Sequence, residues 1–396
     1  MNAQEIRATV GLALIYALRM IGMFMILPVF ALYAHGLPAP ASDLQIGLAI
    51  GIYGLAQAAL QIPIGIASDR WGRKPVIVIG LLIFAAGSFL AGATQEIHWI
   101  IAGRILQGLG AISSAVSALL ADLTRDRVRS SAMAIMGAGM GLAFLGALVA
   151  GPVVAGHIGV DGIFQLTGVL ALLGIPVVLR LVPPAPRPQH SNAGVWTVLR
   201  DPQLLRLDGG ILLLHALLTG LFVAAPFAIV ETLGLPSEAH WEVYLPVLLL
   251  SLLPVFPLMK WAENNQGTRR LFLAAIGVLG LAMPLLAVGH RQPLALLGAL
   301  LLFFMAFNLL EGMLPSLISR RAPPGQRGAA LGVYGSAQFL GPMLGGALLG
   351  GVKGHWGLSA AFAAAACLPL IWLSFATGLR APAAPAPDSG AAAPHH

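Results

Sequence analysis

Long apolar runs are the feature of this sequence that most restricts its fold. They recur about twelve times and are separated by short polar or Gly/Pro-rich clusters. A helix needs roughly 20 mostly apolar residues to cross a bilayer, and its backbone polar groups must be satisfied within the membrane. Because 58% of the residues are hydrophobic and only 9% are charged, little length remains for a soluble domain. We therefore expect an all-α integral membrane protein with twelve transmembrane helices.

The breaks between the runs divide the chain into two sets of six helices. The first set is predicted at residues 8–34, 44–67, 75–94, 99–121, 131–156 and 163–182. The second set is predicted at residues 207–230, 242–261, 271–289, 293–318, 329–352 and 358–379. We expect an N-terminal bundle at 1–182, a cytoplasmic connector at 183–205, a C-terminal bundle at 206–379 and a disordered tail at 380–396. The first run is too long for a signal-peptide core, so it is expected to remain as a helix.

Basic residues predict the orientation of the helices. With the N-terminus placed in the cytoplasm, 18 of the 22 Lys and Arg residues fall in cytoplasmic segments, and only Arg291 and Lys353 fall on the opposite side. This bias follows the positive-inside rule. We therefore expect a multi-pass protein of the bacterial inner membrane with both termini in the cytoplasm. The net charge of +7 is explained by topology, so nucleic-acid binding is not expected.

The sequence contains no pattern that points to an enzyme or to a bound cofactor. Cys367 is the only cysteine, which excludes an intramolecular disulfide and a Cys-based metal site. The histidines lack metal-ligand spacing, and no GxxxxGK[ST] loop is present, so ATP is not the expected energy source. No nucleophile, base and orienting group converge recognisably. We expect no metal, no cofactor and no covalent catalysis.

The two sets of helices contain a weak internal repeat. Arg129 opens one helix and Arg327 opens another, 198 residues later, and the same offset relates Gly137 to Gly335. Both helices then contain a Gly-Pro step, although the offset between the steps is 190. A duplication of this kind predicts two parallel halves related by an axis along the membrane normal.

The loop between the second and third helices has the most specific motif. Its sequence is GIASDRWGRKP, from Gly65 to Pro75, with the pattern G-x-x-x-D-R-x-G-R-K. Taken alone, the charges fit an ordinary cytoplasmic loop. The arrangement in this particular loop, however, resembles the signature of the major facilitator superfamily.

Other segments resemble the drug/proton antiporter branch of that family, and in particular its YajR-type transporters. The fourth helix contains Arg104, Gln107, Gly108 and Gly110, and the Gly-rich fifth helix ends in Gly151-Pro152. Similar segments elsewhere are LRMIGMFMILPVF, IGIYGLAQAALQIP, FFMAFNLLEGMLPSLIS and GVYGSAQFLG, so the resemblance covers nearly the whole chain. It implies two pseudo-symmetric six-helix halves in the major facilitator fold. YajR-type proteins commonly end in a small soluble domain, which we expect to be missing here, since about 17 residues follow the last helix.

The resemblance also implies a conformational latch on the cytoplasmic side. Asp69 would meet the N-terminal end of the eleventh helix, where unpaired amides favour a carboxylate, and Arg73 would pair with Asp122. Gly65 and Gly72 would let the backbones approach. Closing the latch would favour the outward-facing state. The implied latch residues are Gly65, Asp69, Arg70, Gly72, Arg73, Lys74 and Asp122.

Three ionisable residues inside apolar runs are candidates for proton coupling. Placing an arginine at the centre of a membrane helix costs roughly 2.5–3.5 kcal/mol on insertion scales. Arg104 is therefore either a structural residue satisfied by carbonyls of the first or second helix or, as the resemblance implies, part of proton coupling. Glu311 is the leading protonation site, with Asn308 one turn before it; the alternative is a permanently paired carboxylate. His215 could exchange protons with Glu311, or it could be a hydrogen-bonded packing residue.

Polar stripes and methionines give candidates for a substrate cavity. Arg19 and Met23 could face a cavity from the first helix, unless Arg19 is architectural. Tyr53, Gln57 and Gln61 form a polar stripe on the second helix, and such stripes either line a cavity or join helices through hydrogen bonds. The remaining cavity candidates are Asn308, Tyr334 and Gln338, and the candidates for close helix packing are Gly151, Pro152, Gly341 and Pro342.

These observations favour a secondary transporter. We expect a proton-coupled antiporter that exports small, hydrophobic or cationic molecules by alternating access, working as a monomer in the bilayer. A sugar or metabolite exporter and a passive facilitator are also compatible with the motifs. A non-transporting membrane sensor is the alternative from another functional class.

Overall fold

The structure is a computed structural model that describes residues 1–184, 195–323 and 326–379. The expected disordered tail and part of the expected connector lie outside the described residues. Within them the regular structure is entirely helical. The prediction of an all-α membrane fold is confirmed.

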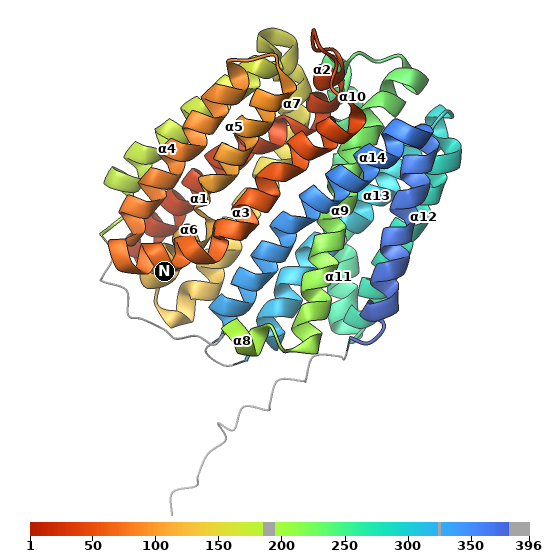
Figure 1. Ribbon diagram of the computed structural model, residues 1–396. Coiled ribbons are helices and arrows are strands. Elements are labelled where there is room, and N and C mark those ends of the chain that lie inside the picture. The colour runs from red at the N-terminus through yellow and green to blue at the C-terminus, as the bar shows by residue number, and fades with distance from the viewer. Residues whose placement is uncertain (185–194, 324–325, 380–396) are drawn as a thin grey trace, which may run out of the picture.

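Ten apolar helical segments are long enough to cross a bilayer in the described part of the chain. Figure 1 shows them packed lengthwise as one bundle. The first half contains α1 (Ala3–Met25), α2 (Leu27–His35), α3 (Asp43–Trp71), α4 (Arg73–Gly92), α5 (Ile97–Leu109), α6 (Ser113–Asp122), α7 (Asp126–Pro176) and η1 (Val177–Leu181). The second half contains α8 (Val195–Val198), α9 (Pro202–Leu233), η2 (Ser237–Ala239), α10 (Trp241–Leu252), α11 (Val255–Asn264), α12 (Thr268–Gly289), α13 (Pro293–Arg321) and α14 (Arg327–Ala376).

Two of these helices cross the membrane twice. α7 has 51 residues and α14 has 50, so each would be about 75 Å long if straight, far more than a bilayer requires. Each contains one glycine with non-helical dihedrals, Gly159 with φ 71° and Gly357 with φ 80°. Glycine adopts positive φ without steric cost, so one residue is enough to turn the chain. The predicted twelve crossings are therefore present, with single-glycine turns where short loops were expected.

The turn glycines extend the internal repeat. Gly159 and Gly357 are 198 residues apart, the same offset that relates Arg129 to Arg327.

Three other crossings are each formed by two helices with a break between them: α1 with α2, α5 with α6, and α10 with α11.

The two halves meet along α3 and α14, which lie side by side in Figure 1. A Cβ on Gly47 would overlap the backbone of Gly346, and one on Gly350 would overlap the backbone of Asp43. Nearer the other end of α14, a Cβ on Gly328 would have no neighbour within 4 Å among the described residues. The close contacts between the halves extend from the Asp43 end of α3 past Gly54, where a Cβ would overlap the Phe339 carbonyl group, to Gln61, which lies 3.6 Å from a Cβ on Gly335.

We name the two membrane faces by the residues they carry. The terminal face carries Asn2, the α3–α4 turn at Gly72 and Leu379, and the far face carries Asp43 and Lys353. The closest contacts between α3 and α14, at Gly47 and Gly346, lie toward the far face.

Candidate functional site

At the terminal face, Arg73 joins the ends of three helical segments. Gly72, with φ 95°, connects α3 to α4 and brings Arg73 back toward the end of α3. The Arg73 guanidinium group lies 2.5 Å from Asp69 Oδ1 and 2.9 Å from Asp122 Oδ2, and it also donates to the Ser68 hydroxyl at 2.7 Å. The pair between Arg73 and Asp122 is formed as the resemblance implied.

The other residues of the α3–α4 loop also make their contacts within the first half of the molecule. Lys74 Nζ donates to the Val182 carbonyl oxygen at 2.5 Å, which fastens the start of α4 to the end of η1. A Cβ on Gly65 would be in ordinary contact with Ser114 of α6. Arg70 is exposed at the end of α3. The loop is therefore a junction of α3, α4, α6 and η1.

The expected contact of Asp69 with the eleventh helix is not formed among the described residues. That helix is the first crossing of α14, and Asp69 pairs with Arg73 instead. Near the start of α14, a Cβ on Gly328 or Gly332 would have no neighbour within 4 Å in the described residues. Asp69 instead pairs within its own loop, so its contact with α14 stays a prediction for a state in which the terminal face is closed.

Inside the first half, Arg19 is fully buried rather than facing a cavity. It donates to the Tyr53 hydroxyl at 2.7 Å and to Gln57 Oε1 at 2.6 Å, and it lies 4.9 Å from the centre of the Phe84 ring. Gln57 in turn donates to the Ser113 hydroxyl at 3.1 Å. Of the two alternatives for the polar stripe on α3, the geometry of Tyr53 and Gln57 matches the second, in which they join helices through hydrogen bonds.

Arg104 has the environment of a structural arginine. Its guanidinium group donates to the carbonyl oxygens of Ala49 and Ile50 on α3, at 3.1 and 3.2 Å, and to Gln107 Oε1 at 2.8 Å. It also lies 5.0 Å from the centre of the Tyr53 ring. Carbonyls of the second crossing thus satisfy Arg104, which matches the structural alternative.

Most of the other cavity candidates are also buried. Met23, Gln61 and Tyr334 are each less than one-tenth exposed. Asn308 Nδ2 donates to the Ser251 hydroxyl at 2.9 Å, so its amide joins α13 to α10. None of these four side chains is widely open to solvent in this conformation.

Gln338, Glu311 and His215 form the central polar cluster of the second half. The Gln338 amide nitrogen lies 3.0 Å from His215 Nε2 and 3.1 Å from Glu311 Oε1, and so bridges α9 and α13 from α14. His215 Nδ1 lies 3.9 Å from Glu311 Oε2. Neither of these last two atoms has a hydrogen-bond partner among the described residues. The Glu311 side chain is 33% exposed, so this cluster combines burial with access.

Aromatic rings cover one side of this cluster. The Phe307 ring lies 6.0 Å from the His215 ring and 5.9 Å from the Phe144 ring of the first half. The Phe24 and Phe144 rings meet edge to face at 4.8 Å. Because α13 runs from the far face to the terminal face, Phe307 lies on the far-face side of Glu311. These aromatic rings therefore connect the two halves at a level between the Glu311 cluster and the far face.

A cluster at the far face was not recognised in the sequence. Lys353 of α14 pairs with Asp43 of α3, and its ammonium group lies 3.6 Å from the centre of the Phe227 ring of α9. The Phe227 ring also packs against His35 at 5.6 Å. One signal was available, since Lys353 is one of only two basic residues assigned to that side.

Asp208 is a second residue that sequence reasoning missed. It lies in α9 and is 5% exposed, and neither carboxyl oxygen has a hydrogen-bond partner among the described residues. It precedes His215 by seven residues, which is close to two helical turns and places both side chains on one face. That spacing was a usable signal, but Asp208 stands at the polar start of its apolar run.

The two glycines before proline pack as expected. A Cβ on Gly151 would overlap the Met25 carbonyl group of α1, and one on Gly341 would overlap the Leu212 carbonyl group of α9. Both glycines therefore allow close contact with the first crossing of their own half. Pro152 and Pro342 follow them within helices that continue beyond the prolines.

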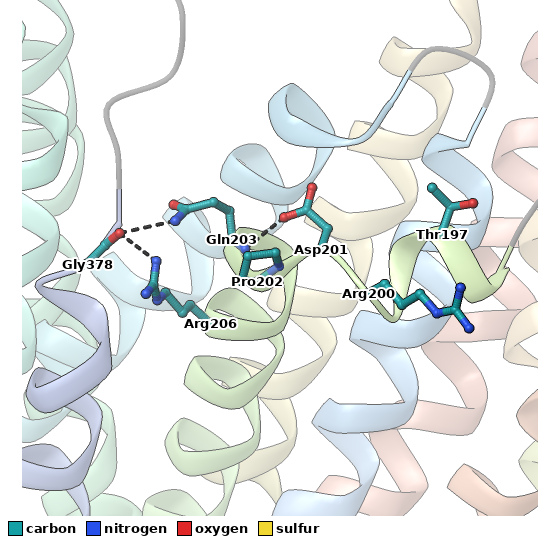
Figure 2. A pocket seen from close by; sticks show the side chains of 7 residues that line it. All are labelled: Thr197, Arg200, Asp201, Pro202, Gln203, Arg206 and Gly378. Carbon is teal, nitrogen blue, oxygen red and sulfur yellow. Dashed lines mark hydrogen bonds between the residues drawn. The ribbon is translucent and has the colours of Figure 1, made fainter.

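A cavity of about 780 Å³ lies away from these clusters, at the terminal face. Figure 2 shows Gln203 and Arg206 directed at the Gly378 carbonyl oxygen, which they reach at 3.2 and 2.7 Å. Asp201 caps α9 by accepting from two backbone amides. These polar groups hold the ends of α9 and α14 in place, so the cavity does not have the features of a substrate site. Its lining residues are Thr197, Arg200, Asp201, Pro202, Gln203, Arg206 and Gly378.

Comparison with known proteins places this architecture in a family. The chain matches the model of the Major Facilitator Superfamily over residues 12–346 and 256–395. The inner membrane transport protein YajR of Escherichia coli (strain K12) is 43% identical over 388 residues, covering 96% of this chain and 85% of YajR. The multidrug resistance protein MdtH of Aeromonas hydrophila is 26% identical over 348 residues, covering 84% of each chain.

Solved structures agree with this fold. A bacterial homolog of the human lysosomal transporter Spinster, in an inward-facing and occupied conformation, has a TM-score of 0.75 at 16% identity and covers 96% of this chain and 97% of its own. The nucleoside transporter NupG has a TM-score of 0.71 at 14% identity, covering 96% of this chain and 99% of its own. Because the family model and YajR both span most of the sequence, this multi-pass membrane protein belongs to the major facilitator superfamily of secondary transporters.

Proposed function

We propose that this protein is a proton-coupled antiporter that exports small hydrophobic or cationic molecules across the bacterial inner membrane. The observation that carries the proposal is the cluster of Glu311, His215 and Gln338. It places a carboxylate and an imidazole within 3.9 Å of each other inside a membrane bundle. Intramembrane ionisable residues are costly, so they mark ion and proton pathways more often than structural positions.

The geometry of the cluster suits the exchange of a proton. With the Gln338 amide donating to Nε2, a neutral His215 carries its own proton on Nδ1, which faces Glu311 Oε2. Both facing atoms lack other hydrogen-bond partners in the described residues. A proton arriving at Glu311 therefore meets a carboxylate oxygen that is not occupied by another hydrogen bond in the described residues. One elementary charge crossing 100 mV supplies about 2.3 kcal/mol, enough to drive uphill export with one or two protons.

The conformation fits the loading step of export. The segments predicted to be cytoplasmic contain 18 of the 22 basic residues, and the α3–α4 turn at the terminal face is one of these segments, so we assign this face to the cytoplasm. In this state the far face is closed by the contacts of α3 with α14 and by the aromatic rings. Substrate would enter from the cytoplasm and reach Glu311 before the halves rock to the opposite state. The Arg73 junction is then positioned to act as the latch when the terminal face closes.

The lining of the cluster favours an apolar or cationic substrate. Phe144 and Phe307 offer aromatic faces, which attract cations as well as apolar groups. Glu311 is the carboxylate beside them, and a bound cation would compete with the proton for it. The name of the relative MdtH, a multidrug resistance protein, supports the same substrate class.

Transport in proteoliposomes tests the proposal. Purified protein would be reconstituted with an imposed pH gradient, and the internal pH followed while ethidium, tetraphenylphosphonium, a neutral dye and a sugar are added in turn. We expect a cation to produce proton flux in the wild type and none in Glu311→Gln. Glu263→Gln is the matched control, because Glu263 is exposed at the surface.

Two outcomes would contradict the proposal. Substrate flux that ignores the pH gradient would make the protein a facilitator. The absence of flux for every compound, from protein with an intact size-exclusion profile, would favour a sensor.

A further inference from the structure

Asp208 is a buried acidic residue for which the fold provides no partner. Its side chain is 5% exposed, and both carboxyl oxygens lack hydrogen bonds among the described residues. An ionised carboxylate without a compensating partner is strongly disfavoured in an apolar environment. In this conformation the side chain is therefore most stable when it carries a proton.

The register between α9 and α14 places Tyr334 opposite Asp208. Both helices start at the terminal face, so they run in the same direction. A Cβ on Gly341 would lie 2.8 Å from the His215 Cβ. Tyr334 precedes Gly341 by seven residues, and Asp208 precedes His215 by seven residues. Each therefore lies about 10.5 Å closer to the terminal face along its own helix, at the same level as the other. Tyr334 also lies within electrostatic range of both Asp208 and Glu311.

Tyr334 is suited to connect the two acids. It is buried, and its hydroxyl group has no hydrogen-bond partner among the described residues. A phenol both donates and accepts hydrogen bonds. Polar atoms without a hydrogen-bond partner among the described residues thus occur on Asp208, Tyr334, Glu311 and His215, so no hydrogen bond joins Tyr334 to either acid in this conformation.

Two arginines on the helices of this region hydrogen-bond to groups other than Asp208. Arg206, on the same helix, donates to the Gly378 carbonyl oxygen at 2.7 Å. Arg321 of α13 donates to Gln203 Oε1 at 3.2 Å. Titratable groups of this region in the described part of the chain include His215 on α9, Tyr334 on α14 and Glu311 on α13.

We infer that Asp208 is a second proton-binding residue, which exchanges protons between the terminal face and Glu311 through the Tyr334 hydroxyl. The step requires hydrogen bonds from Tyr334 to both acids, made directly or through water, which this conformation does not contain; Asp208 then gives its proton to the Tyr334 oxygen while Tyr334 gives its own to Glu311. Asp208 becomes a carboxylate, Glu311 becomes a carboxylic acid, and Tyr334 is unchanged. The role of this step in transport rests on the proposed function, whereas proton binding by Asp208 does not.

Infrared spectroscopy tests the inference without a substrate. The carbonyl stretch of protonated carboxyl groups would be recorded for the protein in liposomes during a pH titration, with deuterium exchange to identify it. We expect two titrating components in the wild type. Asp208→Asn should remove one and Glu311→Gln the other, whereas Glu263→Gln should leave both. Asp208→Glu, which retains a carboxyl group, should restore a shifted component if Asp208→Asn disturbs folding.

Tyr334→Phe tests the relay. It should retain both components but slow proton uptake by Glu311 from Asp208 at least tenfold after a pH jump at the terminal face. A wild-type spectrum unchanged by Asp208→Asn, or uptake at the wild-type rate in Tyr334→Phe, would overturn the inference even if transport is proton-coupled. Loss of the Asp208 component from a protein whose transport ignores protons would support proton binding while refuting the proposed function.

Discussion

The Lys353 ammonium group pairs with the Asp43 carboxylate across the boundary between the two halves, and it also lies 3.6 Å from the centre of the Phe227 ring. The Lys353 side chain is only 8% exposed. Asp43 is in the first turn of α3, after the Ser42 cap, so the helix dipole favours its negative charge. Three crossings, α3, α9 and α14, are thus held together at the far face by one lysine.

Removing this lysine should open the far face. Lys353→Met leaves Asp43 without its counter-ion, and losing one partner of a buried pair costs roughly 3–5 kcal/mol. We expect at least tenfold faster labelling of Met343→Cys by an impermeant maleimide applied to the far face, in a Cys367→Ser background. Arg320→Met is the control, because that arginine is exposed and pairs at the terminal face. Equal labelling rates in Lys353→Met and its parent would show that the pair does not hold this face closed.

Adding a methyl group at Gly346 should also open the far face, because the added carbon would overlap the opposite helix. A Cβ there would overlap the Gly47 carbonyl group, and backbone cannot give way as a flexible side chain can. We expect Gly346→Ala to lengthen the distance between spin labels on Glu96→Cys and Arg291→Cys, while the protein remains folded. Gly298→Ala is the matched control, because that helical glycine has no neighbour within 4 Å in the described residues. An unchanged distance distribution would contradict the predicted overlap.

The fold was largely predictable because lipid imposes a simple rule on the sequence. The length of the apolar runs was sufficient to predict twelve crossings. The turns at Gly159 and Gly357 were harder to place, because hydropathy does not reveal a residue that reverses the chain without a polar loop. Their common offset of 198 residues was visible only as part of the wider repeat.

The candidate site was less predictable because it depends on contacts between distant segments and on conformation. The sequence distance between Asp43 and Lys353 is 310 residues, and nothing local relates them. Apolar sequence around Arg19 allowed either a cavity or a bundle interior, and only helix rotation decides between them. The pairing of Asp69 depends on which face is open. Glu311 was predictable because an acid in the middle of an apolar run is conspicuous.

Arg104 should prove to be mainly structural. Lysine is a point charge that cannot reach the Ala49 and Ile50 carbonyl oxygens and Gln107 together. Leaving buried polar groups unpaired costs about 1–3 kcal/mol each. We therefore expect Arg104→Lys to lower the thermal unfolding temperature in detergent by several degrees, whereas the exposed control Arg270→Lys should not. If the temperature is unchanged while proton flux is lost, the proton-coupling interpretation holds instead.

Asp69 should influence conformation rather than stability. Its pair with Arg73 is partly exposed here, and Arg73 keeps Asp122 when Asp69 is neutralised, so Asp69→Asn should unfold at nearly the wild-type temperature. When the terminal face closes, the carboxylate would approach the amides at the start of α14, an interaction of about 0.3–2 kcal/mol. Pulsed EPR between labels on Trp71→Cys and Lys260→Cys should therefore show roughly two- to thirtyfold less of the closed population in Asp69→Asn. Asp122→Asn is the contrast, because it removes a partner of Arg73 in the first half and should lower stability in both states. A closed population equal to that of the wild type would leave Asp69 as a local partner of Arg73 and exclude it from the latch.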